Sequence, residues 1–314
     1  MTTTPDIAAT TDERIAAIER IVCREVGRGA APLMKATVGN LARMAVDLAA
    51  APSPRVGILT GFFVPWRLTP PMAETDGPVG AAHLAAGVLA AGWGVRVATD
   101  EVCVDAVAAA LAGADATGRA ALDVVPVRHG VRAGMARVVD AWKADGVTHA
   151  LSIERCGRSR DRKPRNMRGE DVSRWTAPLD DLFLAGDWRR LAIGDGGNEI
   201  GMGALPRELI ARSVPHGADI ASTTPADCLV VAGVSNWGAY GLLAALAVLR
   251  PDLAEPLTRT LNAERDLAIL ERMVRDGPAG DPVAGVRAAS VDGFAHPRHA
   301  RVIAAVRRAA DLDR

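Results

Sequence analysis

The sequence has few aromatic residues, few cysteines, no excess of either charge and no long hydrophobic run. Lysine plus arginine and aspartate plus glutamate number 37 each among the 314 residues, so no overall field attracts nucleic acid or an anionic membrane surface. No apolar run approaches the roughly 20 residues that a membrane-spanning helix needs. The first twelve residues lack the basic stretch and apolar core of a secretory signal, so we expect a cytoplasmic protein.

The four cysteines are far apart and form no C-x-x-C pair, and no histidines cluster near them to complete a zinc site. We therefore expect reduced thiols at Cys23, Cys103, Cys156 and Cys228. A charged stretch between Glu154 and Ser173 has no interleaved aromatic residues, and the chain has one tyrosine and four phenylalanines, which disfavours an RNA-binding surface. The expected partner is a small molecule.

Short β-branched runs alternate with segments of helical periodicity in most of the chain. The runs predict strands at Val56–Thr60, Val95–Thr99, Leu122–Val127, Thr148–Ile153, Leu191–Ile193 and Leu229–Val234. Helices are expected between them at Val79–Ala91, Val102–Leu111, Val131–Asp145 and Trp237–Leu249. This alternation predicts an α/β fold with a mostly parallel sheet and helices on both faces, that is, a three-layer α/β/α arrangement.

The N-terminal part of the chain predicts two helices before the first strand, at Asp12–Val26 and Pro32–Leu48. We divide the chain into an N-terminal helical cap, residues 1–52, and an α/β catalytic domain, residues 53–314, within one compact unit. The cap is also a candidate contact surface for a homodimer.

Polar and glycine-rich clusters follow four of the six expected strands. In open α/β sheets the carboxyl ends of the strands form one edge, where ligands bind, so these clusters predict a shared crevice. The segment Gly61–Gly80 is a long loop with four prolines, which is typical of a functional loop. The candidate binding residues at this edge are Glu74, Thr75, Asp76, Gly196, Gly197, Asn198, Ser235 and Asn236, and Arg155, Asn166 and Arg168 join them from the charged stretch. A planar guanidinium suits bidentate binding of a carboxylate, which favours Arg155 or Arg168 for that task.

Several of these residues also have a purely structural interpretation. Asp76 or Thr75 can cap the next helix, with Pro78 in its first turn, and a helix cap is the first expectation for Ser235. Gly196 and Gly197 can serve a tight turn that needs positive φ angles, with Asn198 as the next helix cap. The structural interpretation explains the glycines but leaves Asp195 and Glu199 without a role.

Three ordered motifs identify a family resemblance. The segments Glu74-Thr75-Asp76-Gly77-Pro78, Gly194–Gly203 and Val231–Gly238 resemble the D-glutamate cyclase family, and Ser152–Arg155, Asn166–Gly169 and Val291-Asp292-Gly293 extend the likeness over nearly the whole chain. The resemblance implies a lyase that converts D-glutamate into 5-oxo-D-proline with loss of water and without a nucleotide. Two segments depart from the family pattern, Lys163-Pro164-Arg165 and Gly280–Ala288, and allow a changed substrate preference.

Ring closure needs a base and an acid, because a neutral amine attacks the γ-carboxyl carbon and hydroxide leaves as water. Paired carboxylates divide these roles when their environments separate their pKa values. We expect Asp195, Glu199 and Glu154 to be catalytic, with Glu74 and Asp76 as supporting ligands. No cofactor or metal is assigned. The alternatives are an amide hydrolase or lyase in which Glu74, Asp76, Asp195 and Glu199 hold Mg²⁺ or Mn²⁺, and an amino-acid sensor without catalysis.

Overall fold

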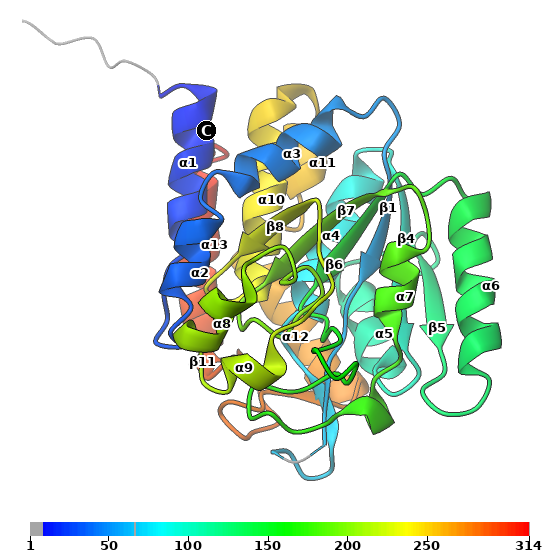
Figure 1. The fold of residues 1–314 in the computed structure, drawn as a ribbon. Helices are drawn as coiled ribbons and strands as arrows, with labels where there is room; N and C mark the ends of the chain where they lie inside the picture. Colours follow the sequence, from blue (N-terminus) through cyan, green and yellow to red (C-terminus); the bar gives the residue numbers. More distant parts are fainter. Residues whose placement is uncertain (1–8, 66, 314) are drawn as a thin grey trace, which may run out of the picture.

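The computed structural model describes residues 9–65 and 67–313, and a six-stranded parallel sheet forms its centre (Figure 1). The strand order is β5-β4-β1-β6-β7-β8, and every neighbouring pair is parallel. The strands are β1 (Arg55–Leu59), β4 (Gly94–Asp100), β5 (Ala121–Val125), β6 (His149–Ile153), β7 (Arg189–Gly194) and β8 (Cys228–Val231). All six predicted strands are confirmed, with boundaries that differ by a few residues.

The strand order reverses direction between β1 and β6, where Val56 pairs with His149. The chain builds β1, β4 and β5 toward one edge and then returns to build β6, β7 and β8 toward the other. The connections after β1 and β6 therefore diverge to opposite sides of the sheet, and in such folds ligands bind at the carboxyl ends of these strands. This switch point is the expected place for a ligand site.

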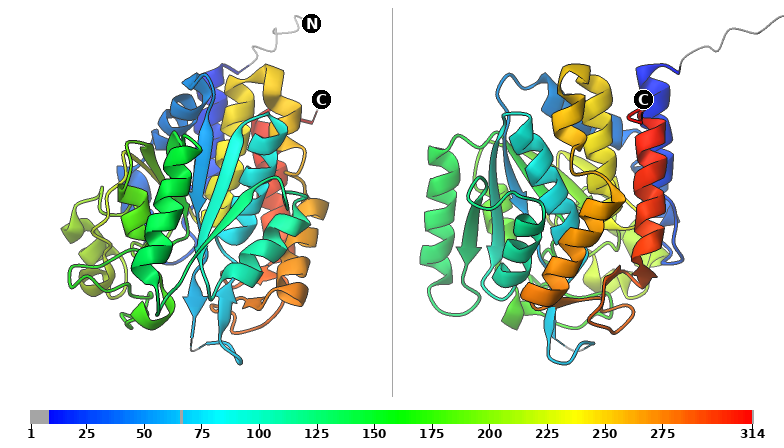
Figure 2. Two further views of the ribbon diagram at one scale, coloured as in Figure 1. Left: turned by 90° about the vertical axis from the view of Figure 1, so that its right-hand side faces the viewer. Right: turned by 180° about the vertical axis from the view of Figure 1, so that it is seen from behind.

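Helices cover both faces of the sheet, as predicted (Figure 2). One core cluster packs α1, α3, α4, α5, α10, α12 and α13 on one face; α6 and α7 cover one part of the other face, and α2, α8 and α9 another. Within the described residues, no helix is both long and apolar enough to span a bilayer. The helices are α1 (Thr11–Val22), α2 (Ala31–Ala36), α3 (Asn40–Ala50), α4 (Pro78–Ala90), α5 (Val104–Gly113), α6 (Val131–Ala144), α7 (Leu179–Leu184), α8 (Arg207–Ser213), α9 (Gly217–Ile220), α10 (Ser235–Leu249), α11 (Ala254–Thr258), α12 (Ala263–Asp276) and α13 (His296–Ala309), with 3₁₀ turns η1 (Ser173–Trp175) and η2 (Pro251–Leu253).

The N-terminal segment packs into the main core. α1 lies beside α13 and α10, and Ile18 and Leu41 join the core cluster of the sheet (Figure 1). The second predicted helix is wrong in one respect, because the chain breaks between α2 and α3, where Gly39 adopts a φ of 86°. The carboxylate of Glu19 accepts the amides of Gly39 and Leu41 at 2.8 and 3.0 Å, which stabilises the break.

The segment Gly61–Gly80, which we expected to be one long loop, contains two short strands. β2 (Phe63–Val64) and β3 (Met72–Glu74) form an antiparallel pair, and β9 (Ala279–Gly280) joins β3 in parallel. A hairpin of β10 (Ser290–Val291) and β11 (Phe294–Ala295) follows. Glu74 ends β3 and pairs with Gly280, so this small sheet brings the C-terminal part of the chain to the switch point. All four cysteines are free, as expected.

Candidate active site

Six buried carboxylates gather beyond the carboxyl ends of the central strands. Oxygens of Asp76, Asp195 and Asp292 lie within 4.8 Å of one another, and so do oxygens of Glu154, Asp195 and Glu199. Each of the six side chains belongs to a residue that is at most 9% exposed; the six are Glu74, Asp76, Glu154, Asp195, Glu199 and Asp292. The structure thus brings together all five acids that the sequence predicts and adds Asp292 to them.

Asp76 and Asn236 join the N-termini of α4 and α10 to each other. The carboxylate of Asp76 accepts the amides of Ser235 and Asn236 at 3.0 and 2.9 Å, at the start of α10. In return, Oδ1 of Asn236 accepts the amides of Gly77 and Gly80 at 2.9 and 2.7 Å, at the start of α4. Asp76 also accepts the amide of Gly77 at 3.0 Å, next to α4, so its expected role at this helix end is met in part. The cap expected from Ser235 is wrong, because α10 has no cap hydrogen bond from its own N-cap residue and the Ser235 side chain binds Glu154. The amides at the start of α10 are thus bound by Asp76 from the loop before α4, and those at the start of α4 by Asn236 from the first turn of α10.

Glu199 holds the glycine-rich turn after β7. Its Oε1 accepts the amides of Asp195 and Gly196 at 2.7 and 2.5 Å, and its Oε2 accepts the amide of Gly197 at 2.6 Å. The predicted positive φ occurs at Gly197, at 102°, but not at Gly196. These three amides bind Glu199 and are not open to a ligand. Asn198 does not cap a helix, since its side chain donates to the carbonyl of Arg165 at 2.8 Å.

Glu154 occupies an unusual backbone position directly after β6. Its φ is 44°, in the left-handed region that costs free energy for a non-glycine residue and occurs often at functional sites. The hydroxyl of Ser235 donates to Oε2 of Glu154 at 2.5 Å. Burial raises the pKa of Glu154 well above its usual range, and the charges of Asp195 and Glu199 raise it further. Burial and these neighbouring charges favour a protonated Glu154.

The pKa values of three other acids in the cluster are also raised. Burial has the largest effect on Asp76, Glu74 and Asp195, and the negative charge of Asp292 acts in the same direction on all three. The guanidinium of Arg28 opposes the rise for each of them, and for Asp195 its effect follows directly after that of burial. Burial and mutual repulsion thus keep protons on part of the cluster.

Arg28 is the cation of the site, and the sequence analysis missed it. Its guanidinium lies 2.9 Å from Oδ2 of Asp195 and 2.6 Å from Oδ2 of Asp292. The flanking Gly27 and Gly29 have φ angles of 97° and 83°, so a Gly-Arg-Gly turn between α1 and α2 places the side chain. This turn is the one signal that could have identified Arg28. Asp292 belongs to one of the motifs of the resemblance, but its carboxylate was not selected.

Arg155 is not placed as expected. Its side chain is fully buried, 2.6 Å from Oδ2 of Asp100, and it donates to the carbonyls of Gly61 and Ala177. These contacts hold the loops at the edge of the sheet, so Arg155 does not offer a free guanidinium to a substrate.

Asn166 of the charged stretch makes its hydrogen bonds within that stretch. Asn166 binds the side chain and the amide of Glu170 and the amide of Arg168, which stabilises its own turn. Arg168 is exposed, and a role in substrate binding stays a prediction. The hydroxyl of Thr75 donates to the carbonyl of Ser290 at 2.7 Å and connects the β3 loop with the C-terminal hairpin.

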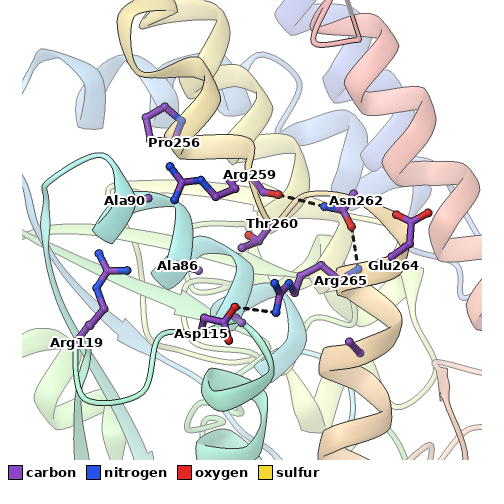
Figure 3. Close-up of a pocket in the computed structure, with 12 residues that line it drawn as sticks. Ala86, Ala90, Asp115, Arg119, Pro256, Arg259, Thr260, Asn262, Glu264 and Arg265 are labelled. Atoms are coloured by element: carbon purple, nitrogen blue, oxygen red, sulfur yellow. Dashed lines mark hydrogen bonds and ion pairs between the residues drawn. The ribbon is translucent and has the colours of Figure 1, made fainter.

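A separate pocket lies away from the carboxylate cluster, between α4, α11 and α12 (Figure 3). Its volume is about 380 Å³, and Arg265 in its wall pairs with Asp115 at 2.9 Å. None of the six carboxylates lines it. Buried acids with shifted pKa values indicate a functional site more directly than the volume of a pocket does. We therefore place the site at the carboxylate cluster.

The fold and this cluster define an α/β protein with buried acid–base groups where such folds bind small ligands. The family model described as "D-glutamate cyclase-like, C-terminal" matches residues 18–307, and the chain belongs to this family. The chain is also similar to the human mitochondrial D-glutamate cyclase, with 32% identity over 280 residues. The match covers 78% of this chain and 44% of the human protein, so the chain spans less than half of that relative. A cytoplasmic location and a homodimer stay predictions.

Proposed function

We propose that this protein interconverts D-glutamate and 5-oxo-D-proline plus water. The observation that carries the proposal is the buried carboxylate cluster around Arg28, in a chain of the D-glutamate cyclase-like family. In the cyclising direction, the ammonium of the substrate loses a proton and the amine attacks the γ-carboxyl carbon. A C–N bond forms, a C–O bond breaks, and the leaving oxygen departs as water with the two protons that the ammonium has lost.

Glu154 and Asp195 have environments suited to the acid and the base of this reaction. Glu154 is buried among other acids, which favours its protonated form, and it can donate a proton to the leaving oxygen. Burial raises the pKa of Asp195, and the guanidinium of Arg28, 2.9 Å away, opposes this rise; a carboxylate with a raised pKa beside a cation fits a base for the ammonium. Glu199 acts on the reaction through the turn that it holds, as a positioning residue.

Arg28 is our candidate for binding the α-carboxylate of the substrate. It is the one guanidinium that pairs with the cluster within residues 9–65 and 67–313, and its side chain is 22% exposed. A guanidinium binds a carboxylate through two parallel hydrogen bonds, which an ammonium cannot reproduce. The Arg28→Lys variant should therefore raise KM for D-glutamate about tenfold, because one charge-assisted bond is lost. Steady-state kinetics measure this change, and an unaltered KM would contradict the assignment.

Proton NMR of the purified protein with D-glutamate, L-glutamate and 5-oxo-D-proline tests the proposed reaction. We expect selective interconversion of the D compounds, and a loss of about 100-fold or more in Glu154→Gln and in Asp195→Asn, as is typical for general acid–base groups. Glu255→Gln is the control, since Glu255 is an exposed acid on α11. A wild-type protein that turns over none of these compounds would refute the proposed function. Saturable binding without product would favour an amino-acid sensor.

A further inference from the structure

The carboxylate cluster holds more acids than its one cation can pair with. Within the described residues, Arg28 alone makes ion pairs with the six acids, through Asp195 and Asp292. If all six acids were ionised, five negative charges would remain uncompensated in a region that is nearly closed to water. Buried charges persist when they are paired, protonated or bound to a metal ion.

The proposed substrate makes this excess larger. D-Glutamate brings two carboxylates and one ammonium, so its binding adds one more negative charge to the site. Both acids already pair with the guanidinium of Arg28, so Arg28 would have to share its charge between them and a substrate carboxylate. A dicarboxylate therefore needs a second source of positive charge in this site.

Three of the acids lie close enough together to share a small divalent cation. Oxygens of Asp76, Asp195 and Asp292 lie within 4.8 Å of one another. Oxygen ligands about 2.1 Å from an octahedral Mg²⁺ lie about 3–4.2 Å apart, so small side-chain adjustments would complete the triad. The amides of Ser235 and Asn236 already fix the orientation of Asp76. The three ligands come from the β1–α4, β7 and β10–β11 connections, which the fold brings together independently.

Glu74 gives a second observation that points to a ligand. Its residue is 8% exposed, and its Oε1 is buried without a hydrogen-bond partner. Glu74 lies beside the triad, because it precedes Asp76 by two residues and its neighbour Thr75 binds the carbonyl of Ser290, two residues before Asp292. A buried carboxylate oxygen without a donor is costly, and a cation or one of its bound waters would satisfy it.

We propose that Asp76, Asp195 and Asp292 bind a divalent cation that prefers oxygen ligands, Mg²⁺ or Mn²⁺, with Glu74 as a further ligand or as the acceptor of a metal-bound water. The cation takes over part of the pairing of Asp195 and Asp292 and so releases Arg28 for the substrate carboxylate. This role rests on the proposed function, whereas binding of the cation does not.

Titration of the metal-free protein with Mn²⁺, followed by the electron paramagnetic resonance signal of free Mn²⁺, tests the site without substrate. We expect one bound Mn²⁺ per chain and a Kd raised at least about tenfold in Asp292→Asn and in Glu74→Gln. Asp187→Asn, in an exposed turn before β7, is the matched control and should bind as the wild type does. Circular dichroism verifies that each variant is folded. Absence of Mn²⁺ binding at millimolar concentration, or equal affinity in all variants, would overturn the site.

Activity separates this proposal from the proposed function. Chelated wild-type protein that turns over D-glutamate at an undiminished rate would overturn the cation's role in substrate binding and leave the cyclase function intact. Site-specific Mn²⁺ binding without turnover of any glutamate or 5-oxoproline would support the cation site and count against the cyclase function.

Discussion

The Glu199→Gln substitution separates a positioning role of this carboxylate from a catalytic one. The two oxygens of Glu199 accept three backbone amides, from Asp195, Gly196 and Gly197. Glutamine keeps one acceptor oxygen, so at least one amide would face the N–H₂ group instead. A hydrogen bond to a charged group contributes about 1.5–3 kcal/mol, and a buried donor without an acceptor costs about 1–3 kcal/mol. The substitution also removes one negative charge from the cluster, and the reduced repulsion offsets part of this cost. We therefore expect the free energy of unfolding to fall by about 2–3 kcal/mol.

Urea denaturation followed by circular dichroism measures this change, with D-glutamate turnover measured on the same samples. The Glu255→Gln control should show no measurable shift, because Glu255 lies on the surface, where its pair with Arg259 contributes little. For Glu199→Gln we expect a lower midpoint and an activity that follows the folded fraction. An unchanged midpoint with a loss of turnover of about 100-fold would refute the reasoning and identify Glu199 as a proton-transfer group.

Three further predictions concern stability. Asn236→Ala should lower the free energy of unfolding by about 1–3 kcal/mol, since the buried amide of Gly80 loses its acceptor while that of Gly77 keeps the carboxylate of Asp76; a change below about 0.5 kcal/mol in urea denaturation would contradict the cross-capping. Gly57→Ala should cost about 1–3 kcal/mol, seen as a lower Tm, because its Cβ would lie 2.3 Å from the Trp142 ring. Burial raises the pKa of Glu154 above 4.5, so the native state keeps a proton that the unfolded state releases. Unfolding free energy should therefore decrease as pH rises above 4.5, and Glu154→Gln should flatten this slope.

The central sheet was predictable because each of its strands is a short apolar run bounded by turn residues. β6 and β8 are buried along their whole length, and such runs have few alternatives to a strand between two helical layers. The strands β2, β3 and β9 were missed, since segments of two or three residues carry no recognisable alternation. Only their pairing with one another gives them a regular structure.

The acids of the site were predictable from their positions after strands, and their contacts were not. Glu74, Asp76, Glu154 and Asp195 follow predicted strands in the sequence, so the parallel topology alone places them at one edge. Arg28 lies in a turn between helices, far from these residues in the sequence, and it reaches the cluster through tertiary packing of the N-terminal segment. The positions of the acids in the sequence therefore identified the edge of the sheet that holds the site. The positive charge that pairs with these acids comes from Arg28, which no strand position indicates.

The reciprocal capping of α4 and α10 explains how the fold keeps such an acidic site in place. The helix amides of Ser235 and Asn236 lower the pKa of Asp76, which opposes the larger effect of burial, and a helix N-terminus also favours nearby negative charge. The side-chain oxygen of Asn236 accepts the amides of Gly77 and Gly80 at the start of α4. Because this oxygen belongs to a neutral amide, both buried donors are satisfied without a further charge. The loops after β1 and β8 are thereby fixed to each other across the switch point. The distance between Asp76 and the acids of β6 and β7 consequently depends on the sheet as a whole rather than on one flexible loop.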